Sequence, residues 1–357
     1  MSTMTRSSIL TAALALGSLA HAQCGSGTPD ASVTGSGSSF TATSGSSEVY
    51  SGSDYAAAIQ AAVDSVSAGQ RVAVIASGSI DTSTITLPSG IIFEGCGTID
   101  VGTASGRGSI ESTDTTDVQI PYLSMTGTPY FGLRFSGTTG LALGAVTMEL
   151  SGGMGIRFDR DAAANANVTM ESIRVTGAGS HAVETWNIDG LDVGEVVARG
   201  CGESGLLLQT VTNARVGLVD GDDVGAGTGY ATLRLANNAG QLADGGYATN
   251  IFVDRVVSRG GGRGVFCVSQ SGGAEIGEID LADNGNNAIL IENCYNLSIL
   301  GGTVEGGGEV RISARDEFPN TSDVSITATV NDNSVRESPC GENITWDISG
   351  SASQDVC

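Results

Sequence analysis

A short segment around His181 holds the side chains best suited to acid–base chemistry in this chain. It contains an imidazole at His181, a carboxylate at Glu184 and an indole at Trp186. Histidine exchanges protons near neutral pH, a carboxylate can orient it, and an exposed indole stacks on the apolar face of a sugar ring. The segment is therefore the first candidate for an active centre. The alternative is that His181 is a structural histidine and that Trp186 covers a loop.

Arginines recur at one position of a repeated phrase. From Phe131 to Ile312, a small residue, an aliphatic, a variable residue and a second apolar residue return every 21 to 32 residues. Four of the eight variable positions are arginine, and arginine grips carboxylates bidentately, so the column predicts a groove that binds acidic groups. The alternative is that each arginine neutralises a neighbouring acid, as Arg157 and Glu184 could do on adjacent repeats. In chain order, the variable positions are Arg134, Arg157, Glu184, Leu207, Arg234, Phe266, Leu290 and Arg311.

Further polar side chains are expected beside this column. Side chains alternate along a strand, so residues two positions beyond the column face the same way. The residues two positions beyond the column are candidates for substrate binding: Asp159, Trp186, Gln209 and Glu292. Three more residues lie near the same face. Arg263 and Arg315 are candidates for substrate binding, and Tyr230 is a candidate proton donor.

Two acidic pairs offer a different chemistry. Asp159 with Glu184, or Asp222 with Asp223, would supply the two carboxyl groups of a glycoside hydrolase. The acidic turn Asp220–Asp223 could instead hold calcium, the only cofactor that the sequence suggests. It lacks the spaced oxygens and the closing glutamate of an EF-hand loop, so a solvated turn is the alternative.

The repeat predicts the fold that positions these residues. Its interval, its glycine turns and the lack of helices between strands are typical of a right-handed, single-stranded parallel β-helix, whose coils stack about 4.8 Å apart. The two apolar positions point inward and the variable one points to solvent. The predicted all-β domain covers residues 53–357, and insertions within 211–230 and 237–250 could wall a cleft. Asparagines near coil ends, such as Asn287, Asn293 and Asn296, are interpreted as turn residues, with a role in binding as the alternative.

The N-terminal part is expected to precede and close the stack. Residues 1–22 have an arginine, an apolar run and small residues around His21, as in a secretory signal peptide. Residues 23–52 are rich in Ser, Gly and Thr and are interpreted as an exposed arm or an irregular lead-in to the fold. Residues 53–66 are predicted to form a helix that Ser53 or Asp54 caps and that covers the N-terminal end of the core.

The cysteines and sequons agree with an extracellular protein. Seven cysteines leave at least one unpaired in a monomer. We expect Cys340 to pair with Cys357 and pin the last segment to the final coil, and Cys267 to lie at an inward position. Four Asn-x-Ser/Thr triplets are potential glycosylation sites. They begin at Asn167, Asn296, Asn320 and Asn343.

Charge excludes several classes of partner and enzyme. The net charge of -23 disfavours nucleic acids and anionic membranes. All 16 cationic residues are arginine, so Schiff-base and phosphate-loop lysines are excluded. With His21 in the signal segment, His181 is the only histidine of the mature chain, and an ordinary zinc site is not expected. We expect a monomer that binds a polysaccharide.

Several segments resemble the pectin-lyase-like β-helix superfamily, which includes pectate lyases and polygalacturonases, over about residues 53–350. The opening segments 55–63 and 86–90 are similar to the lead-in of these proteins. Four triplets follow the order of a polygalacturonase signature, with Arg263 where that signature has histidine. They are Asn187-Ile188-Asp189, Gly221-Asp222-Asp223, Gly262-Arg263-Gly264 and Arg311-Ile312-Ser313.

The resemblance implies a secreted enzyme that depolymerises a pectin-like, uronate-containing polysaccharide. Pectate lyases, by this resemblance, remove the proton beside a uronate carboxyl. We favour β-elimination with His181 as the base, Tyr230 as proton donor, Arg157 and Arg234 holding the carboxylate and Glu184 orienting the site. A hydrolase that uses a carboxylate pair is one alternative, and a non-catalytic glycan-binding β-helix is the other.

Overall fold

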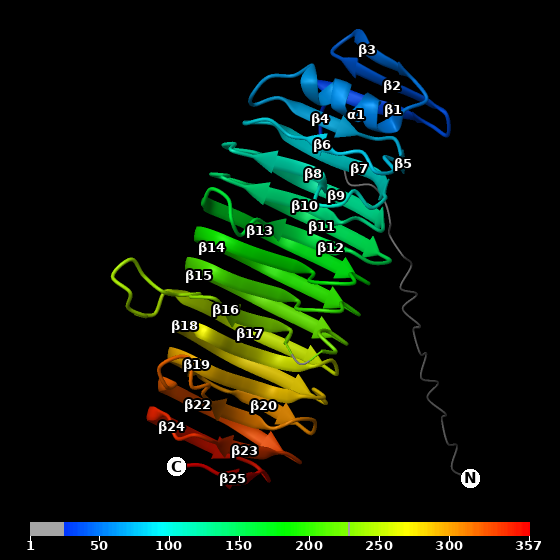
Figure 1. Cartoon of the computed structure of the whole chain (residues 1–357). Coiled ribbons are helices and arrows are strands. Elements are labelled where there is room, and N and C mark those ends of the chain that lie inside the picture. Colours follow the sequence, from blue (N-terminus) through cyan, green and yellow to red (C-terminus); the bar gives the residue numbers. More distant parts are fainter. Residues whose placement is uncertain (1–24, 228) are drawn as a thin grey trace, which may run out of the picture.

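The residues of the repeated phrase form short parallel strands that stack one above another (Figure 1). In this computed structural model, residues 25–227 and 229–357 are described, and the predicted signal segment lies outside them. Leu133 pairs with Ile156, and Arg134 pairs with Arg157. These strands make up the first face, which comprises β6 (Ile85–Thr86), β8 (Gly108–Thr113), β10 (Phe131–Ser136), β12 (Met154–Phe158), β16 (Leu233–Ala236), β21 (Val310–Ser313), β23 (Ser334–Glu337), β25 (Ser353–Asp355) and the first parts of β14 (Val183–Arg199), β15 (Leu206–Asp222), β18 (Arg263–Ala282) and β19 (Asn287–Ile299).

Each coil continues from the first face into a second and then a third. Long strands bend between them, as in β14 and β15, which pair in parallel on all three faces. Besides the later parts of the long strands above, the second and third faces contain β4 (Arg71–Val74), β5 (Gly78–Ser79), β7 (Ile92–Val101), β9 (Gln119–Gly127), β11 (Ala142–Leu150), β13 (Asn165–Thr176), β17 (Ile251–Arg259), β20 (Gly302–Glu305), β22 (Ser322–Asn331) and β24 (Glu342–Ser349).

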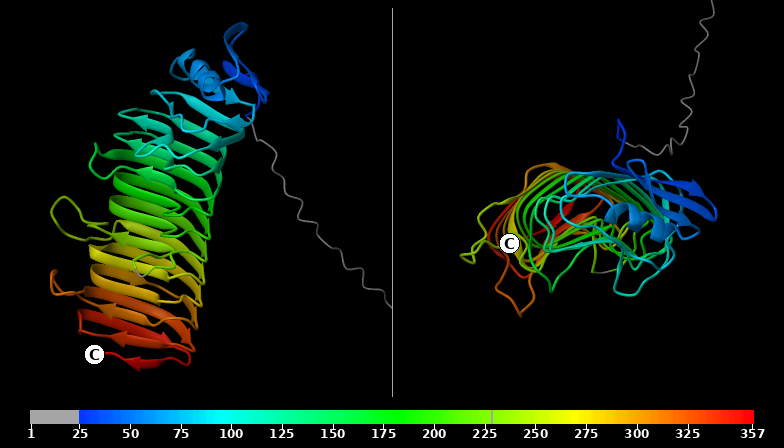
Figure 2. Two further views of the ribbon diagram at one scale, coloured as in Figure 1. Left: turned by 45° about the vertical axis from the view of Figure 1, so that its right-hand side comes forward. Right: turned by 90° about the horizontal axis from the view of Figure 1, so that it is seen from above.

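The predicted fold class is confirmed. Successive coils wind around a common axis, as the view from above shows (Figure 2), and pair in parallel on every face. A chain that returns to a parallel neighbour in the same sheet turns right-handedly in about 98% of cases. Over residues 25–227 and 229–357 the molecule is a right-handed, single-stranded parallel β-helix with one helix at the N-terminal end of the stack.

Inward-facing side chains fill the axis of the stack, as the alternation predicts. Leu133 and Phe135 are fully buried on either side of the outward-facing Arg134. The rings of Phe135 and Phe158 lie 5.3 Å apart on adjacent coils. Removing such a ring costs about 3–5 kcal/mol because the lining of a packed core closes only partly around the void. This core fixes which residues face solvent.

The N-terminal end is closed by a helix and an ordered three-stranded sheet. Helix α1 (Tyr55–Asp64) is capped by Asp54, whose side chain accepts a hydrogen bond from the backbone of Ala57, and it buries Ile59 against the core. The prediction of a capping helix is confirmed, but the prediction of an exposed arm or irregular lead-in is wrong for the described residues of that segment, 25–52. Val33 and other alternating apolar residues there are buried against α1 and the first coil. The strands are β1 (Ala31–Ser36), β2 (Ser39–Ser44) and β3 (Ser47–Gly52).

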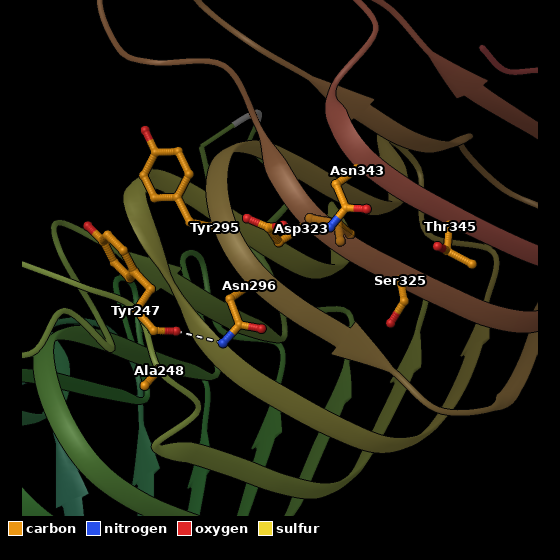
Figure 3. Close-up of a pocket in the computed structure, with 9 residues that line it drawn as sticks. Tyr247, Ala248, Tyr295, Asn296, Asp323, Ser325, Asn343 and Thr345 are labelled. Atoms are coloured by element: carbon orange, nitrogen blue, oxygen red, sulfur yellow. Dashed lines mark hydrogen bonds between the residues drawn. The ribbon is translucent and has the colours of Figure 1, made fainter.

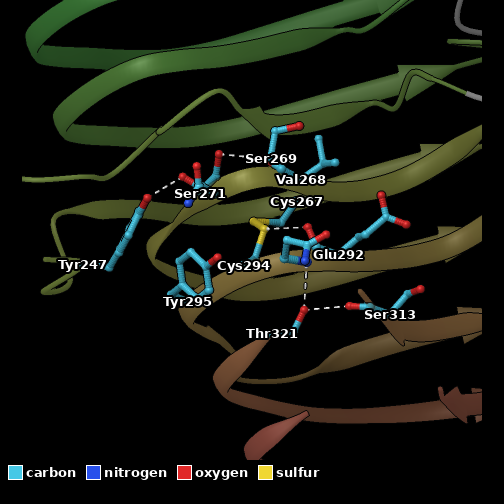
Figure 4. Close-up of a disulfide and its surroundings, with 12 residues drawn as sticks. Tyr247, Cys267, Val268, Ser269, Ser271, Glu292, Cys294, Tyr295, Ser313 and Thr321 are labelled. Atoms are coloured by element: carbon cyan, nitrogen blue, oxygen red, sulfur yellow. Dashed lines mark hydrogen bonds between the residues drawn. A yellow bond between two sulfur atoms is a disulfide. The ribbon is translucent and has the colours of Figure 1, made fainter. Parts of the chain in front are cut away.

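Two disulfides link residues in the C-terminal half of the described chain. Cys340 pairs with Cys357, as predicted. Cys267 is fully buried at its inward position, as expected, and in addition bonds to Cys294 on the next coil (Figure 4). Among the described cysteines Cys201 is a free, buried thiol. The inward disulfide joins two coils through the core rather than across the surface.

Polar residues with left-handed backbone angles line the turn between the first two faces. Asn293 (φ 53°) and Asn296 (φ 51°) adopt this conformation, which asparagine tolerates better than most residues. Their interpretation as turn residues is confirmed, whereas it is wrong for Asn287, which begins β19 without a left-handed backbone angle. Of the two expected insertions, residues 211–222 belong to β15, whereas residues 237–250 form a long loop that packs beside β19 through an Asn296–Tyr247 hydrogen bond.

Candidate functional site

The predicted column exists in the predicted register. Strand pairing places Arg157 beside Glu184, Glu184 beside Leu207, and Leu207 beside Arg234. The same register continues through Phe266 and Leu290 to Arg311. All these residues stand on the outer side of the first face, so their environments can be compared coil by coil.

In the N-terminal half of the column, the arginines are neutralised by acids of adjacent coils. Arg134 pairs with Glu111 at 3.1 Å and with Asp159 at 2.8 Å. Arg157 pairs with Glu184 and lies 3.5 Å from Asp159. The alternative that each arginine neutralises a neighbouring acid therefore holds for Arg134 and Arg157. Arg157 also lies between Asp159 and Glu184, the two carboxylates of one hydrolytic pair that the sequence suggested.

Glu184 is the centre of a saturated polar network. Its Oε1 accepts hydrogen bonds from Trp186 Nε1 (2.8 Å) and Gln209 Nε2 (2.9 Å), while its Oε2 is bound by Arg157. Trp186 is only 8% exposed, and the guanidinium of Arg160 lies over its ring. The indole is therefore covered, and its face is not open to a sugar in this arrangement.

The C-terminal half of the column is also largely paired. Arg311 lies 3.4 Å from Glu309, and Glu292 lies 2.9 Å from Arg315. Arg263 is buried, with Nε 3.2 Å from Asn287 Oδ1 and its guanidinium over the ring of Phe266. These predicted binding residues are brought to one face, but most of their charge is met within the protein.

Arg234 differs from the other arginines of the column, which form ion pairs. No carboxylate of the described residues forms an ion pair with it, and its half-buried side chain has an Nε without a hydrogen-bond partner. Its guanidinium lies 5.9 Å from the ring centre of Tyr230 and 5.4 Å from that of Phe266. Burial lowers the pKa of Arg234, yet a guanidinium remains protonated in proteins.

His181 is buried one coil before Glu203 and has both ring nitrogens engaged. Its Nδ1 accepts a hydrogen bond from the backbone N–H of Ser204 at 2.9 Å, so the neutral ring carries its proton on Nε2. That Nε2 lies 2.9 Å from Glu203 Oε2. In this arrangement His181 orients a carboxylate and has no free lone pair with which to accept a substrate proton.

Glu203 is a site residue that the sequence reasoning missed. Ser180 donates a hydrogen bond to it, and Tyr230 is hydrogen-bonded to it. The hydrogen bond from His181 is the largest cause that lowers the pKa of Glu203, to about 2, and the bond to Glu203 raises the pKa of Tyr230. Ser180, Glu203 and Tyr230 each stand four positions before the column on successive coils, so the register itself contained the signal.

Five side chains from three adjacent coils thus form what we call the Arg234 cluster. It contains an imidazole, two carboxylates, a phenol and a guanidinium without an ion-pair partner among the described residues, and both carboxylates act electrostatically on Arg234. The members are His181, Glu184, Glu203, Tyr230 and Arg234.

The acidic turn lies apart from this cluster. Asp220 is paired with Arg199 at 2.6 Å, and Asp222 and Asp223 are exposed where β15 leaves the third face. No three His, Cys, Asp or Glu side chains in the described part of the chain gather as metal ligands would. The turn therefore offers one engaged carboxylate and two solvated ones.

The four triplets that resemble a polygalacturonase signature do not converge on one face. Asp189 accepts hydrogen bonds from Thr212 and Asn213 where the coil enters the second face. Asp222 lies at the far end of the third face, whereas Arg311 belongs to the first. The order of the triplets along the chain is therefore not matched by a common site.

Two open cavities lie on the second face rather than over the column. One, of about 610 Å³, is lined by residues such as Tyr247, Tyr295 and Asp323 (Figure 3). The other, of about 420 Å³, is lined by residues such as Asp192, Arg215 and Phe252. Neither includes a member of the Arg234 cluster.

Comparisons with known proteins give little to compare. No family model and no curated protein matches the chain. Among solved structures, a family 28 exopolygalacturonase from Yersinia enterocolitica is similar with a TM-score of 0.42 and 12% identity, over 84% of this chain and 75% of that chain.

Proposed function

We propose that this protein is a secreted carbohydrate-active enzyme that cleaves an acidic polysaccharide by β-elimination at the Arg234 cluster. The observation that carries the proposal is Arg234, a half-buried guanidinium whose charge no carboxylate of the described residues pairs. Such a group binds a planar carboxylate strongly because it is already poorly solvated and offers a rigid fork of donors. A uronate carboxylate is the matching ligand.

In this scheme Arg234 makes the substrate easier to deprotonate. Pairing the uronate carboxylate with a guanidinium stabilises the negative charge that develops when the adjacent C5 loses its proton. The Phe266 and Tyr230 rings around Arg234 reduce the water that would otherwise screen this charge. Arg157, which is already paired with Glu184, keeps that carboxylate in place instead of binding substrate.

Glu203 and Tyr230 carry the protons in opposite directions. The low pKa of Glu203 keeps it ionised, and the raised pKa of Tyr230 keeps the phenol protonated. Glu203 takes the C5 proton, the C4–C5 double bond forms, the C4–O4 bond breaks, and Tyr230 protonates O4. The proton on Glu203 then returns to the Tyr230 phenolate, which is the stronger base. His181 holds Glu203 in place throughout.

A hydrolase is the second candidate, supported by the presence of two carboxylates, Glu184 and Glu203, around one cation. Hydrolysis needs one carboxyl group to act as an acid with a raised pKa. The pKa of Glu203 moves in the opposite direction, and Glu184 is held ionised by its ion pair with Arg157. Elimination with a phenol as the acid needs no such carboxyl group.

The test is to incubate the protein with polygalacturonate, alginate, glucuronate-containing and neutral polysaccharides. Unsaturated ends are measured by ultraviolet absorbance and new ends by reducing-sugar assay. Elimination raises both signals together on an acidic polymer. Reducing ends without absorbance would mean hydrolysis, and silence on all acidic polymers, with binding retained, would favour a glycan-binding protein.

A further inference from the structure

The cavity of about 610 Å³ on the second face combines an aromatic wall with a polar floor (Figure 3). Tyr247, from the loop 237–250, and Tyr295, from β19, stand together at one end with their ring centres 5.0 Å apart. Across the cavity, β22 and β24 present Asp323, Asn343 and Thr345. An aromatic wall facing hydroxyl, amide and carboxylate groups is the chemistry that recognises sugars.

The aromatic wall is held in place by its polar ends. The Tyr247 hydroxyl donates to the backbone carbonyl of Gln270, and the Tyr295 hydroxyl donates to that of Pro319 at 3.2 Å. Asn296 Nδ2 donates to the backbone carbonyl of Tyr247 at 2.6 Å and so ties the loop to the coil. A ring fixed before binding loses little conformational entropy when a ligand stacks on it.

The floor offers hydrogen-bonding groups that the protein uses only in part. Asn343 Nδ2 donates to Asp323 Oδ1 at 2.7 Å across adjacent coils, and both side chains are exposed. An amide has a carbonyl oxygen and two N–H groups, and a carboxylate has about four acceptor positions. The pair can therefore accept from and donate to neighbouring hydroxyl groups of one ring while Thr345 contributes a further hydroxyl.

Charge decides which saccharide fits. Asp323 is the only charged residue among those that line the cavity, and no arginine is among them. A uronate would place its carboxylate near that of Asp323 in a protein with a net charge of -23. This is the opposite of the Arg234 cluster, where a guanidinium on the outer side of the first face has no ion-pair partner among the described residues.

We propose that this cavity is a second, non-catalytic site that binds a neutral oligosaccharide by stacking on Tyr247 and Tyr295 and by hydrogen bonds to the Asp323–Asn343 pair. The inference does not depend on the reaction proposed for the Arg234 cluster. An enzyme with both sites would be anchored to neutral chains while it acts on acidic ones.

The test measures binding of neutral and acidic oligosaccharides by calorimetry and by saturation-transfer NMR. The full chain is produced in a bacterial periplasm, where disulfides form and the sequons at Asn296 and Asn343 carry no glycan. The probes are cello-, manno-, xylo- and galacto-oligosaccharides, with oligogalacturonate as the acidic probe. The variants are Tyr295→Ala and Asp323→Ala, and the control is Tyr122→Ala on β9, a tyrosine of the third face that does not line the cavity.

We expect at least one neutral probe to bind. Tyr295→Ala or Asp323→Ala should weaken the affinity for that probe about tenfold, which is equivalent to one lost stacking or hydrogen-bonding contact. Tyr122→Ala should leave the affinity unchanged. Arg234→Gln should also leave it unchanged while it reduces binding of oligogalacturonate. The proposal is overturned if no neutral probe binds, or if binding survives both Tyr295→Ala and Asp323→Ala. Loss of oligogalacturonate turnover alone would count against the Arg234 cluster and not against this cavity.

Discussion

Arg234 is the residue at which the column departs from mutual neutralisation. The other arginines of the column form ion pairs with carboxylates of the same or adjacent coils, whereas the Arg234 guanidinium is stabilised mainly by aromatic rings and by carboxylates at longer range. A poorly solvated cation without an ion-pair partner lowers the stability of the folded state. Proteins ordinarily retain such a cation only where its charge takes part in binding or catalysis. This is why function is assigned to Arg234 rather than to Arg134 or Arg157.

The first prediction concerns Arg234→Gln. Charge-assisted hydrogen bonds contribute about 1.5–3 kcal/mol, so kcat/KM on an acidic polysaccharide should fall by about ten- to a hundredfold. The free energy of unfolding should stay the same or rise, because a half-buried cation is removed. The matched control is Arg174→Gln on β13, which removes an exposed arginine that pairs with Glu195 on β14. Equal activity of the two variants would contradict the assignment.

The second prediction concerns the pH dependence of stability at Glu203. Its folded-state pKa is lowered from 4.5 to about 2, chiefly by the hydrogen bond from His181. Because this pKa is lowered by folding, the ionised carboxylate of Glu203 contributes to the free energy of unfolding. That contribution is fully present above the unfolded-state pKa and is lost as the pH falls through the folded-state pKa. The wild type should therefore lose stability relative to Glu203→Gln between about pH 4.5 and pH 2.

Urea denaturation at a series of pH values measures this difference. Glu48→Gln serves as the control, because Glu48 is an exposed carboxyl group on β3. If the stability difference between wild type and Glu203→Gln is constant across the window, the coupling between His181 and Glu203 is absent. The same variant should be inactive in the elimination assay, because it lacks the proposed base.

At the scale of elements, the sequence predicts the first face well because its signal is local. Alternation places Leu133 and Phe135 inward, and counting from one aliphatic to the next aligns the coils. The prediction of an irregular lead-in was wrong because it followed the Ser-, Gly- and Thr-rich composition of the segment. It overlooked the alternation of apolar and polar residues around Val33, which is typical of a strand. The pairing state of Arg234 could not be predicted, because it depends on side-chain conformations and on the loops that cover each coil. Glu203 could have been found by extending the register four positions upstream.

The third prediction concerns the disulfide between β18 and β19. Cys267 and Cys294 lie 27 residues apart, and both are fully buried. Closing a loop of this length stabilises the folded state by about 3–4 kcal/mol relative to the unfolded chain. Replacing both by alanine should lower the free energy of unfolding by about that amount or more, since two buried side chains also shrink.

Guanidinium denaturation measures the loss in this double variant, and Cys201→Ala is the control. Cys201 is also buried but forms no disulfide, so its replacement should cost only the packing of one sulfur atom. A double variant as stable as the control would mean that the inward disulfide adds nothing to the stacking of the coils.

At the scale of the whole molecule, the stack depends on how its two ends are closed. Each coil contacts only its neighbours, so a terminal coil leaves apolar residues and unpaired strand edges unless something covers them. Helix α1 and β1–β3 cover the N-terminal end (Figure 1). At the other end, Glu337 accepts hydrogen bonds from Trp346 Nε1 and from the backbone of Gly341, and Cys357 bonds to Cys340.

The fourth prediction follows from this closure. Deleting residues 338–357 removes β24 and β25, and with them the strands that pair with β22 and β23. Ile326 and Val335, now almost fully buried, would then face solvent beside two open strand edges. The truncated chain should elute from a size-exclusion column as larger species than the full chain at equal concentration, as edge-to-edge pairing predicts. Cys357→Ser separates the two causes: it keeps the covering strands and opens only the disulfide, so it should lower stability without association. Association of Cys357→Ser to the same degree would show that the disulfide, and not the covered edge, keeps this end closed.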